Sequence, residues 1–108
     1  MKAGEIWLAA LDPTVGSEIQ KTRPCVVISP NELNDHLRTV IVAPMTTGSH
    51  PARFRIPVTF KGKQGLIVLD QIRTLDRLRL VKRMGALRAA TLTTTLQTLQ
   101  AMFAPGTR

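Results

Sequence analysis

Tyrosine is absent from this 108-residue chain, which has one tryptophan, three phenylalanines and a single cysteine. One cysteine excludes an intrachain disulfide and a multi-cysteine metal site. Cys25 lies in the apolar run CVVIS with no activating base nearby in the sequence, and we interpret it as a small buried hydrophobic side chain. The shortage of aromatic residues argues against a sheet that binds single strands by stacking. Any nucleic acid would instead be contacted through polar groups and phosphates.

Signatures of cofactors and of membranes are missing as well. The sequence has no Walker loop and no dinucleotide-binding glycine fingerprint, and His36 and His50 lack partners at metal-ligand spacing. We therefore expect no metal and no cofactor. No apolar run approaches the roughly 20 residues needed to span a bilayer, and no secretory signal is visible at the start of the chain. A soluble, cytoplasmic protein that does not bind membranes is the expectation.

Acidic residues are scarce relative to basic ones. Fifteen lysines and arginines face seven acidic residues, which gives a net charge of +8 and a pI of about 11.2. The excess is concentrated between Arg53 and Arg88, where only Asp70 and Asp76 are acidic. Such a balance favours a polyanionic partner, either nucleic acid or an acidic protein. The alternative is a solvated basic surface that only keeps the protein soluble.

The chain length predicts one domain over residues 1–108. Short apolar runs recur at intervals typical of a small β-barrel, and a single helical turn at most is expected at residues 30–34. Strands are expected at residues 5–11, 25–29, 40–45, 53–60, 66–69 and 80–87, with residues 72–75 as a possible extension of the fifth. The run at 40–45 is apolar almost throughout, which predicts burial on both faces. The last strand is expected to carry Lys82 and Arg83 outward.

Residues 53–60 alternate between polar and apolar side chains, which predicts a half-buried strand. Its inward positions are expected to be Phe54, Ile56, Val58 and Phe60. Pro57 cannot donate a backbone hydrogen bond and favours a sheet edge or a bulge. Residues 61–65 (KGKQG) are expected to form the turn of a hairpin with the next strand.

The segment from Ala89 to Thr107 carries no charged residue. Leu92, Leu96, Leu99 and Phe103 recur at helical spacing, and Pro105 and Gly106 follow. A C-terminal helix that covers one end of the barrel with this stripe is the main interpretation. The uncharged polar face leaves a subunit contact as the lesser alternative. The predicted fold class is thus mostly β with a C-terminal α-helix.

The loop GSEIQKTRP, from Gly16 to Pro24, separates the first two predicted strands and ends in Arg23. Arginine is planar, permanently charged and able to give two parallel hydrogen bonds, so it suits a phosphate group. Its place beside the entry to a strand combines a fixed position with a mobile neighbouring segment. The loop therefore predicts a phosphate-binding site.

Three motifs together resemble the MazF/PemK group of toxin endoribonucleases: the N-terminal run GEIWLAALDPTVGSEIQKTRPCVVIS, then PMTTGS, then LDQIRTLD. The resemblance extends from Gly4 to Leu99, in matching order and spacing. It implies a small SH3-like barrel of the CcdB/MazF type that forms a homodimer. It also implies sequence-selective, metal-independent cleavage of single-stranded RNA, including messenger RNA, which inhibits translation and growth. Silencing by a cognate acidic, MazE-like antitoxin is implied too.

The resemblance carries over to individual residues. Arg23 matches the catalytic arginine of the family, and Thr46 matches the threonine after the third strand. RNA-binding positions are implied at Ser17, Glu18, Gln20, Lys21, Thr47, Ser49, Asp70, Gln71 and Arg73. Some relatives carry histidine where this chain has Ser17, and some carry arginine at the position of Val68, so this chain lacks both of those groups.

The expected chemistry needs few residues, because the ribose 2′-OH can attack the neighbouring phosphorus. Arg23 would stabilise the developing negative charge, and the Thr46 hydroxyl would donate a further hydrogen bond. Thr46 could alternatively just satisfy a turn backbone. The general base is left unassigned: Glu18 is one candidate, but it could equally form a structural pair with Lys21 or Arg23. Asp70 is interpreted as structural, orienting the chain around Gln71 and Arg73.

Two other functions remain open from the sequence. A non-enzymatic inhibitor of DNA gyrase, like the CcdB poisons on the same fold, would act through the C-terminal helix and would not need the pair of Arg23 and Thr46. A plain basic RNA-binding module would bind RNA and DNA without cutting either.

Overall fold

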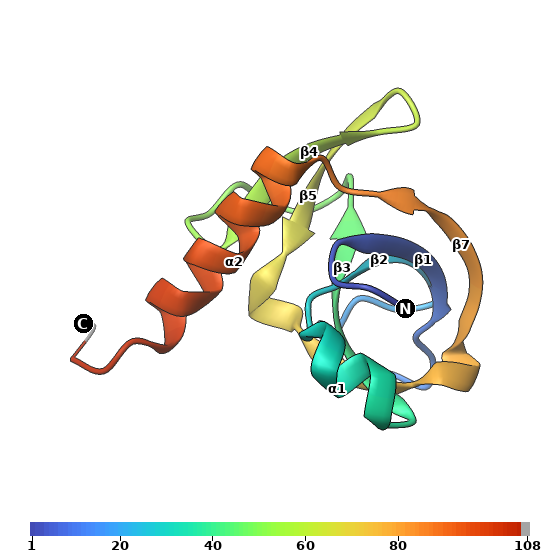
Figure 1. Ribbon diagram of the computed structural model, residues 1–108. Coiled ribbons are helices and arrows are strands. Elements are labelled where there is room, and N and C mark those ends of the chain that lie inside the picture. The colour runs from blue at the N-terminus through green and yellow to red at the C-terminus, as the bar shows by residue number, and fades with distance from the viewer. Residues whose placement is uncertain (107–108) are drawn as a thin grey trace.

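The computed structural model describes residues 1–106 and shows a strongly curled antiparallel sheet with one long helix beside it (Figure 1). The strands are β1 (Glu5–Ala10), β2 (Thr22–Val27), β3 (Thr39–Thr46), β4 (Arg55–Phe60), β5 (Lys63–Val68), β6 (Arg73–Asp76) and β7 (Leu80–Ala86). The helices are α1 (Asn31–His36) and α2 (Ala89–Phe103), with 3-10 turns η1 (Leu69–Gln71) and η2 (Arg77–Arg79). The predicted class, a small mostly β barrel with a C-terminal helix, is confirmed.

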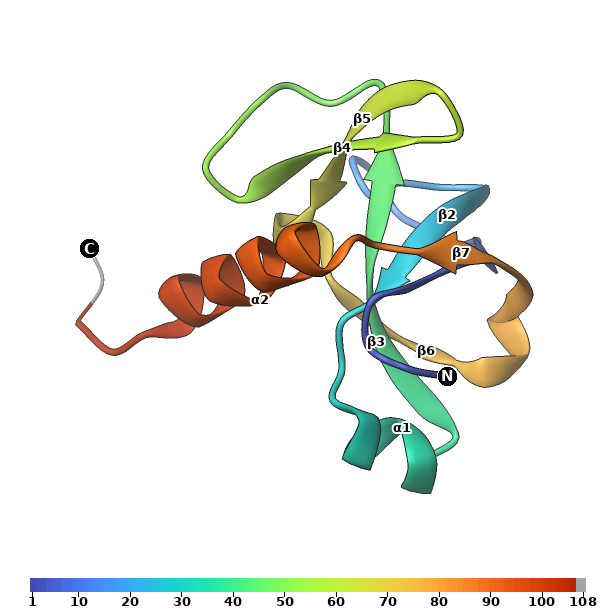
Figure 2. The same cartoon turned by 45° about the horizontal axis from the view of Figure 1, so that its top comes forward.

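Strand β3 is the centre of the fold. The strand order is β4-β5-β3-β2-β1-β7, and β6 pairs with β3 outside this path. β3 pairs with β2 through its middle, with β6 through its first half and with β5 through its last two residues. The strand therefore leaves β2 and continues beside β5, which joins the curled sheet to the β4–β5 hairpin (Figure 2).

Alternation along the strands produces two hydrophobic clusters, because successive side chains point to opposite faces. On β2, Cys25 and Val27 belong to the cluster inside the curled sheet, and Val26 belongs to the cluster on the outer face. The inner cluster consists of Ala9, Leu11, Cys25, Val27, Val40, Val42, Leu75 and Leu80. The outer cluster consists of Ile6, Val26, Ile28, Ala43, Met45, Ile56, Ile67 and Leu69. β3 contributes to both, as its apolar run predicts, and the buried state expected for Cys25 is confirmed.

Several element boundaries differ from the predictions. β2 begins at Thr22, so Arg23 lies within the strand, paired with Ala9, rather than at the end of the loop. The hairpin turn is shorter than expected: Lys61 (φ 50°) and Gly62 (φ 76°) form a two-residue connection whose positive φ values match the twist of the flanking strands.

Two further segments were assigned wrongly from the sequence. Residues 72–75 do not extend β5, because η1 turns the chain and β6 pairs with β3 instead. α1 is longer than a single turn. Its stability comes from the buried Asn34, whose amide donates to the Ser29 carbonyl and whose side-chain oxygen accepts from the Ser29 hydroxyl. A tertiary hydrogen-bond network thus overrides weak local propensity.

The β4 prediction holds in part. β4 is the last strand of the order, as Pro57 indicates, and Ile56 is buried. Phe54 was expected to point inward but precedes the strand and is 38% exposed. Lys82 and Arg83 of β7 face outward as predicted.

α2 packs with a face that differs from the predicted stripe. Leu99 and Met102 contact the outer cluster and Thr95 is fully buried, whereas Leu96 and Phe103 are 36% and 69% exposed. Burial of Thr95 is tolerated because its hydroxyl donates to the Thr91 carbonyl at 2.8 Å. The helix contacts β4, and its C-terminal part projects beyond the sheet (Figures 1 and 2).

Candidate functional site

Arg23 and Thr46 are brought together by the register of β2 and β3. The two strands pair antiparallel with Val26 opposite Ala43 and Cys25 opposite Pro44. The recorded pairs end there, and Arg23 and Thr46 each lie two residues further along their strands. Sequence reasoning chose these two residues, and the fold brings both into the lining of one small pocket at the rim of the curled sheet.

A pocket of about 210 Å³ opens between them. β3 leaves β2 at this point to pair with β5, since Thr46 lies opposite Leu66. β5 approaches very closely here: a Cβ on Gly65 would lie 2.8 Å from the Thr46 carbonyl oxygen, so only glycine fits without a shift of the backbone. The pocket is lined by Arg23, Pro24, Met45, Thr46, Thr47, Val58, Phe60, Lys63 and Gly65.

The Arg23 guanidinium is half-buried and has no carboxylate partner within residues 1–106. Its Nε donates to the Gln20 carbonyl at 3.2 Å, which fixes one edge of the planar group. The pocket thus holds a positive charge that is oriented but not neutralised, together with Lys63. An anion that enters the pocket gains a charge-assisted hydrogen bond without displacing an ion pair.

The Thr46 hydroxyl is engaged on one side. Its oxygen accepts a hydrogen bond from the Gly48 backbone N–H at 3.2 Å, which is the turn-stabilising contact considered from the sequence. This contact uses a lone pair and leaves the hydroxyl proton as a donor. A turn contact and donation to a bound phosphate are therefore compatible.

A second, larger groove of about 670 Å³ adjoins the pocket and shares Thr47, Val58, Phe60 and Gly65 with it. Thr47 and Ser49, both expected to contact RNA, line this groove. It runs from the β4–β5 hairpin to the start of α2.

Side chains within and beyond the loop between β1 and β2 hold its backbone groups. The Glu18 carboxylate accepts from the Val15 N–H at 2.7 Å, and it forms no ion pair with Lys21 or Arg23 within the described chain. The structural pair with Lys21 or Arg23, one of the two alternatives left open by the sequence, is therefore not formed there. Lys21 has a positive φ of 69°, its side chain is exposed, and its carbonyl accepts from the Leu11 N–H at 2.9 Å.

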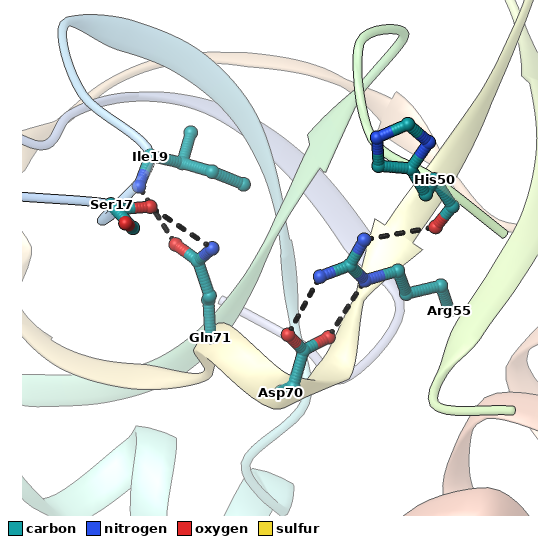
Figure 3. Close-up of polar contacts among 6 residues, drawn as sticks. All are labelled: Ser17, Ile19, His50, Arg55, Asp70 and Gln71. Atoms are coloured by element: carbon teal, nitrogen blue, oxygen red, sulfur yellow. Dashed lines mark hydrogen bonds and ion pairs between the residues drawn. The ribbon is translucent and has the colours of Figure 1, made fainter. Parts of the chain in front are cut away.

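Asp70 binds Arg55 rather than orienting Gln71 and Arg73. The two side chains form a bidentate pair, with Arg55 Nε 3.1 Å from Oδ1 and Arg55 Nη2 3.0 Å from Oδ2 (Figure 3). Arg55 Nη1 also donates to the His50 carbonyl at 2.9 Å. The hydrogen bonds from Arg55 hold the pKa of the Asp70 carboxyl below its usual value, which outweighs partial burial. Asp70 is thus a structural ion, and its partner Arg55 was missed because strand alternation gives only the face of a side chain.

Gln71 and Arg73, both expected to bind RNA, contact the loop between β1 and β2. Gln71 Oε1 accepts from the Ile19 N–H at 2.7 Å, and Gln71 Nε2 lies 3.5 Å from the Ser17 carbonyl (Figure 3). Arg73 Nη1 donates to the Leu11 carbonyl at 3.1 Å. Arg79, which no motif singled out, donates to the Ala10 and Asp12 carbonyls at the start of the same loop.

Neither a candidate metal cluster nor a membrane-spanning helix is found in the part of the chain that the structure describes. No group of three or more histidine, cysteine or acidic side chains gathers in residues 1–106. None of the helices there is both long and apolar enough to cross a membrane.

Comparison with known proteins gives consistent matches. The family model described as PemK-like, MazF-like toxin of type II toxin–antitoxin system matches residues 2–103. Endoribonuclease PemK of Escherichia coli is 41% identical over 81 residues, which cover 70% of this chain and only 61% of PemK. Endoribonuclease MazF of Staphylococcus epidermidis is 37% identical over 90 residues, covering 78% of this chain and 75% of that protein.

Solved structures show the same fold at lower identity. MazF from Deinococcus radiodurans superposes with a TM-score of 0.82 at 24% identity, covering 94% of each chain. An endoribonuclease from a mycobacterial species, solved in complex with its cognate antitoxin, superposes with a TM-score of 0.81 at 20% identity, covering 97% of each chain.

Proposed function

The chain belongs to the PemK-like, MazF-like toxin family of type II toxin–antitoxin systems, and we propose that it is an endoribonuclease that cleaves single-stranded RNA at the Arg23–Thr46 pocket. The observation that carries this proposal is that an arginine with no ion pair within residues 1–106 and a threonine line the same small pocket at the rim of the sheet. The names of the relatives, Endoribonuclease PemK and Endoribonuclease MazF, support the same activity.

Arg23 supplies the electrostatic part of the reaction. As the 2′-oxygen approaches phosphorus, negative charge grows on the non-bridging oxygens, and the fixed guanidinium stabilises it. The Thr46 hydroxyl donates a second hydrogen bond to the same group. Because arginine stays protonated at any physiological pH, we assign Arg23 this role rather than that of a general base.

The RNA supplies its own nucleophile. A new bond forms between phosphorus and the ribose 2′-oxygen while the bond from phosphorus to the 5′-oxygen of the next nucleotide breaks. The 2′-OH proton leaves to a base and the departing 5′-oxygen takes up a proton, so the products are a 2′,3′-cyclic phosphate and a 5′-OH. This route requires no metal ion, because Arg23 provides the compensating charge. Glu18 Oε1 is occupied by the Val15 N–H, and no residue is assigned as the base.

Ser17, Glu18, Gln20 and Lys21 of the loop, together with Thr47 and Ser49 of the groove, are proposed to contact the RNA. All but Ser49 are exposed, and Ser49 is half-buried. The net charge of +8 attracts a polyanion to this surface. These six side chains are proposed to position the strand rather than to perform the chemistry.

The partners follow from the same charge and from the family. We propose that an acidic, MazE-like antitoxin, partly disordered when free, covers the basic surface and silences the toxin. Solved relatives are described as a complex of MazE and MazF and as an endoribonuclease with its cognate antitoxin. We further propose that the protein acts in the cytoplasm as a homodimer, and that cutting messenger RNA inhibits growth.

The decisive experiment is cleavage of a long, defined RNA in EDTA, with cut sites mapped by primer extension and the new ends identified chemically. The proposal predicts a restricted set of cut sites, 2′,3′-cyclic phosphate ends, and no activity in Arg23→Ala. Arg38→Ala is the matched control, because Arg38 is exposed beside the first residue of β3, at the opposite end of that strand from Thr46. Cleavage that requires a divalent ion, or that survives in Arg23→Ala, would refute the mechanism.

The gyrase-inhibitor alternative is not favoured by the family match or by the named relatives. A supercoiling assay with purified protein distinguishes the two, since an endoribonuclease leaves DNA gyrase active. A plain binding module would bind the RNA in EDTA and leave it intact.

A further inference from the structure

A short run of contacts connects η1 to Arg23. Gln71 Oε1 accepts from the Ile19 N–H at 2.7 Å, and the carbonyl of the next residue, Gln20, accepts from Arg23 Nε at 3.2 Å. Gln71 and Arg23 therefore contact adjacent residues of the same loop. The Gln71 amide also reaches the Ser17 carbonyl at 3.5 Å (Figure 3).

The element that carries Gln71 is itself fixed. The preceding residue, Asp70, is clamped by both nitrogens on one edge of Arg55, and Arg55 also binds the His50 carbonyl. Leu69, the first residue of η1, is fully buried, and its N–H donates to the Phe54 carbonyl at 2.9 Å. Gln71 thus projects from a rigid corner onto an otherwise exposed loop.

We infer that Gln71 is a positioning residue that orients the Arg23 guanidinium through Ile19 and Gln20. Its kinetic consequence rests on the proposed function. Without Gln71 the Ile19 N–H loses its partner, so the Gln20 carbonyl is no longer held where Arg23 Nε needs it. The guanidinium then samples more orientations, and fewer of them place it on the phosphate.

A direct contact between Gln71 and RNA is the competing explanation for this residue. Both ends of its amide already face loop backbone in the structure without RNA, and the 2.7 Å bond to Ile19 is short for a neutral pair. RNA contact would require this bond to break first. The contacts therefore favour a role within the protein.

Limited trypsin digestion tests the loop without any RNA. Trypsin can cut after the exposed Lys21, whereas Pro24 protects the bond after Arg23. We expect Gln71→Ala to raise the cutting rate at Lys21 by roughly five- to tenfold, as loss of one hydrogen bond allows. Gln71→Glu keeps an acceptor for the Ile19 N–H and should restore most of the protection. Gln97→Ala, which removes an exposed glutamine on α2, should digest like the wild type.

RNA cleavage tests whether the effect passes through Arg23. Gln71→Ala should lower kcat more than it raises KM, since the lost orientation matters in the transition state. In an Arg23→Lys background, which has no guanidinium to orient, the same change should have little further effect. An equal loss in both backgrounds would show that Gln71 contacts RNA directly and would overturn the inference.

The digestion and cleavage experiments distinguish failure of the positioning role from failure of the proposed function. Unchanged digestion at Lys21 in Gln71→Ala, with an unchanged thermal midpoint, overturns the positioning role whatever the RNA result. A wild-type protein that leaves RNA intact refutes the proposed function, and the digestion then decides the loop contact alone.

Discussion

The rim between β2 and β3 and the corner at η1 each present an arginine, and their surroundings differ sharply. Arg23 at the rim makes one hydrogen bond to a backbone carbonyl and has no acidic partner among residues 1–106. Arg55 near the corner is bound by both oxygens of Asp70 and by the His50 carbonyl. One guanidinium is oriented and available, and the other is fully engaged.

The difference shows how one residue type serves two purposes. A carboxylate bound through both oxygens neutralises the charge of an arginine and occupies its hydrogen-bond donors, so that the pair stabilises the fold. An arginine held by one neutral carbonyl keeps both its charge and its outer donors. The rim is therefore suited to bind an anion, and the corner is suited to hold the chain on either side of it.

The largest effect should follow from removing each arginine in turn. Arg23→Ala should lower RNA cleavage at least roughly 10²–10³-fold, below detection when cut sites are mapped, and leave the thermal midpoint near that of the wild type, because no ion pair is lost. Arg55→Ala should lower the midpoint and reduce cleavage much less. Cleavage assays and thermal unfolding of both variants check this. The comparison fails if Arg55→Ala is as inactive as Arg23→Ala while still folded.

A smaller effect is expected at the threonine that lines the same pocket as Arg23. Thr46→Val removes the hydroxyl that accepts from the Gly48 N–H and donates into the pocket, and should slow cleavage roughly tenfold. Thr46→Ser keeps the hydroxyl and should stay close to the wild type. Single-turnover rates measure both. Equal rates for the valine and serine variants would show that the hydroxyl plays no part.

The ion pair between Arg55 and Asp70 should make the stability of the folded protein depend on pH. Hydrogen bonds from Arg55 lower the pKa of Asp70 in the folded state, so the pair stabilises the protein above the ordinary carboxyl value of about 3.9. That contribution is lost as pH falls through the lower folded-state pKa. The stability difference between wild type and Asp70→Asn should thus be full at neutral pH and vanish in acid.

Urea unfolding from neutral pH down to strongly acidic pH measures this difference. Asp35→Asn is the matched control, since Asp35 is exposed and forms no ion pair within the described residues. A difference for Asp70→Asn that stays constant with pH would mean that the pair with Arg55 does not stabilise the fold.

The smallest effect is expected two residues beyond Arg23 on the same strand face. Cys25 is fully buried, and burial raises the pKa of its thiol to about 12 despite the nearby charge of Arg73. Iodoacetamide at mildly alkaline pH should leave the folded protein unmodified and active, and should alkylate it fully in urea. Rapid labelling of the folded protein, followed by mass spectrometry, would show that the rim opens as far as Cys25.

Much of the fold was predictable because the strands are short and strongly patterned. Alternation predicted a half-buried strand at β4, and the unbroken apolar run predicted the doubly buried β3. The predicted face of α2 was partly wrong, because the prediction used the spacing of the leucines and assigned Thr95 to the polar face. In the structure the Thr95 hydroxyl bonds within the helix, so that residue is buried while Phe103 is exposed.

The candidate site was predictable to a different extent for each residue. The family motifs selected Arg23 and Thr46, which the structure brings into the lining of one pocket. The same motifs grouped Asp70 and Gln71 with the RNA contacts, although one binds Arg55 and the other binds Ile19. Arg55 lies 15 positions from Asp70, and Ile19 lies 52 positions from Gln71. Local sequence patterns do not predict contacts at such separations.

The sequence by itself determined the basic charge, the short strands, the C-terminal helix and the residues able to bind a phosphate, since these depend on composition and on local periodicity. Only the tertiary structure decided which arginine stays available. Charge neutralisation depends on which carboxylate lies within hydrogen-bond reach, and this distance is set by the curl of the sheet and the turn at η1. Arg55 meets Asp70 there, whereas within residues 1–106 the Arg23 side chain meets only the Gln20 carbonyl.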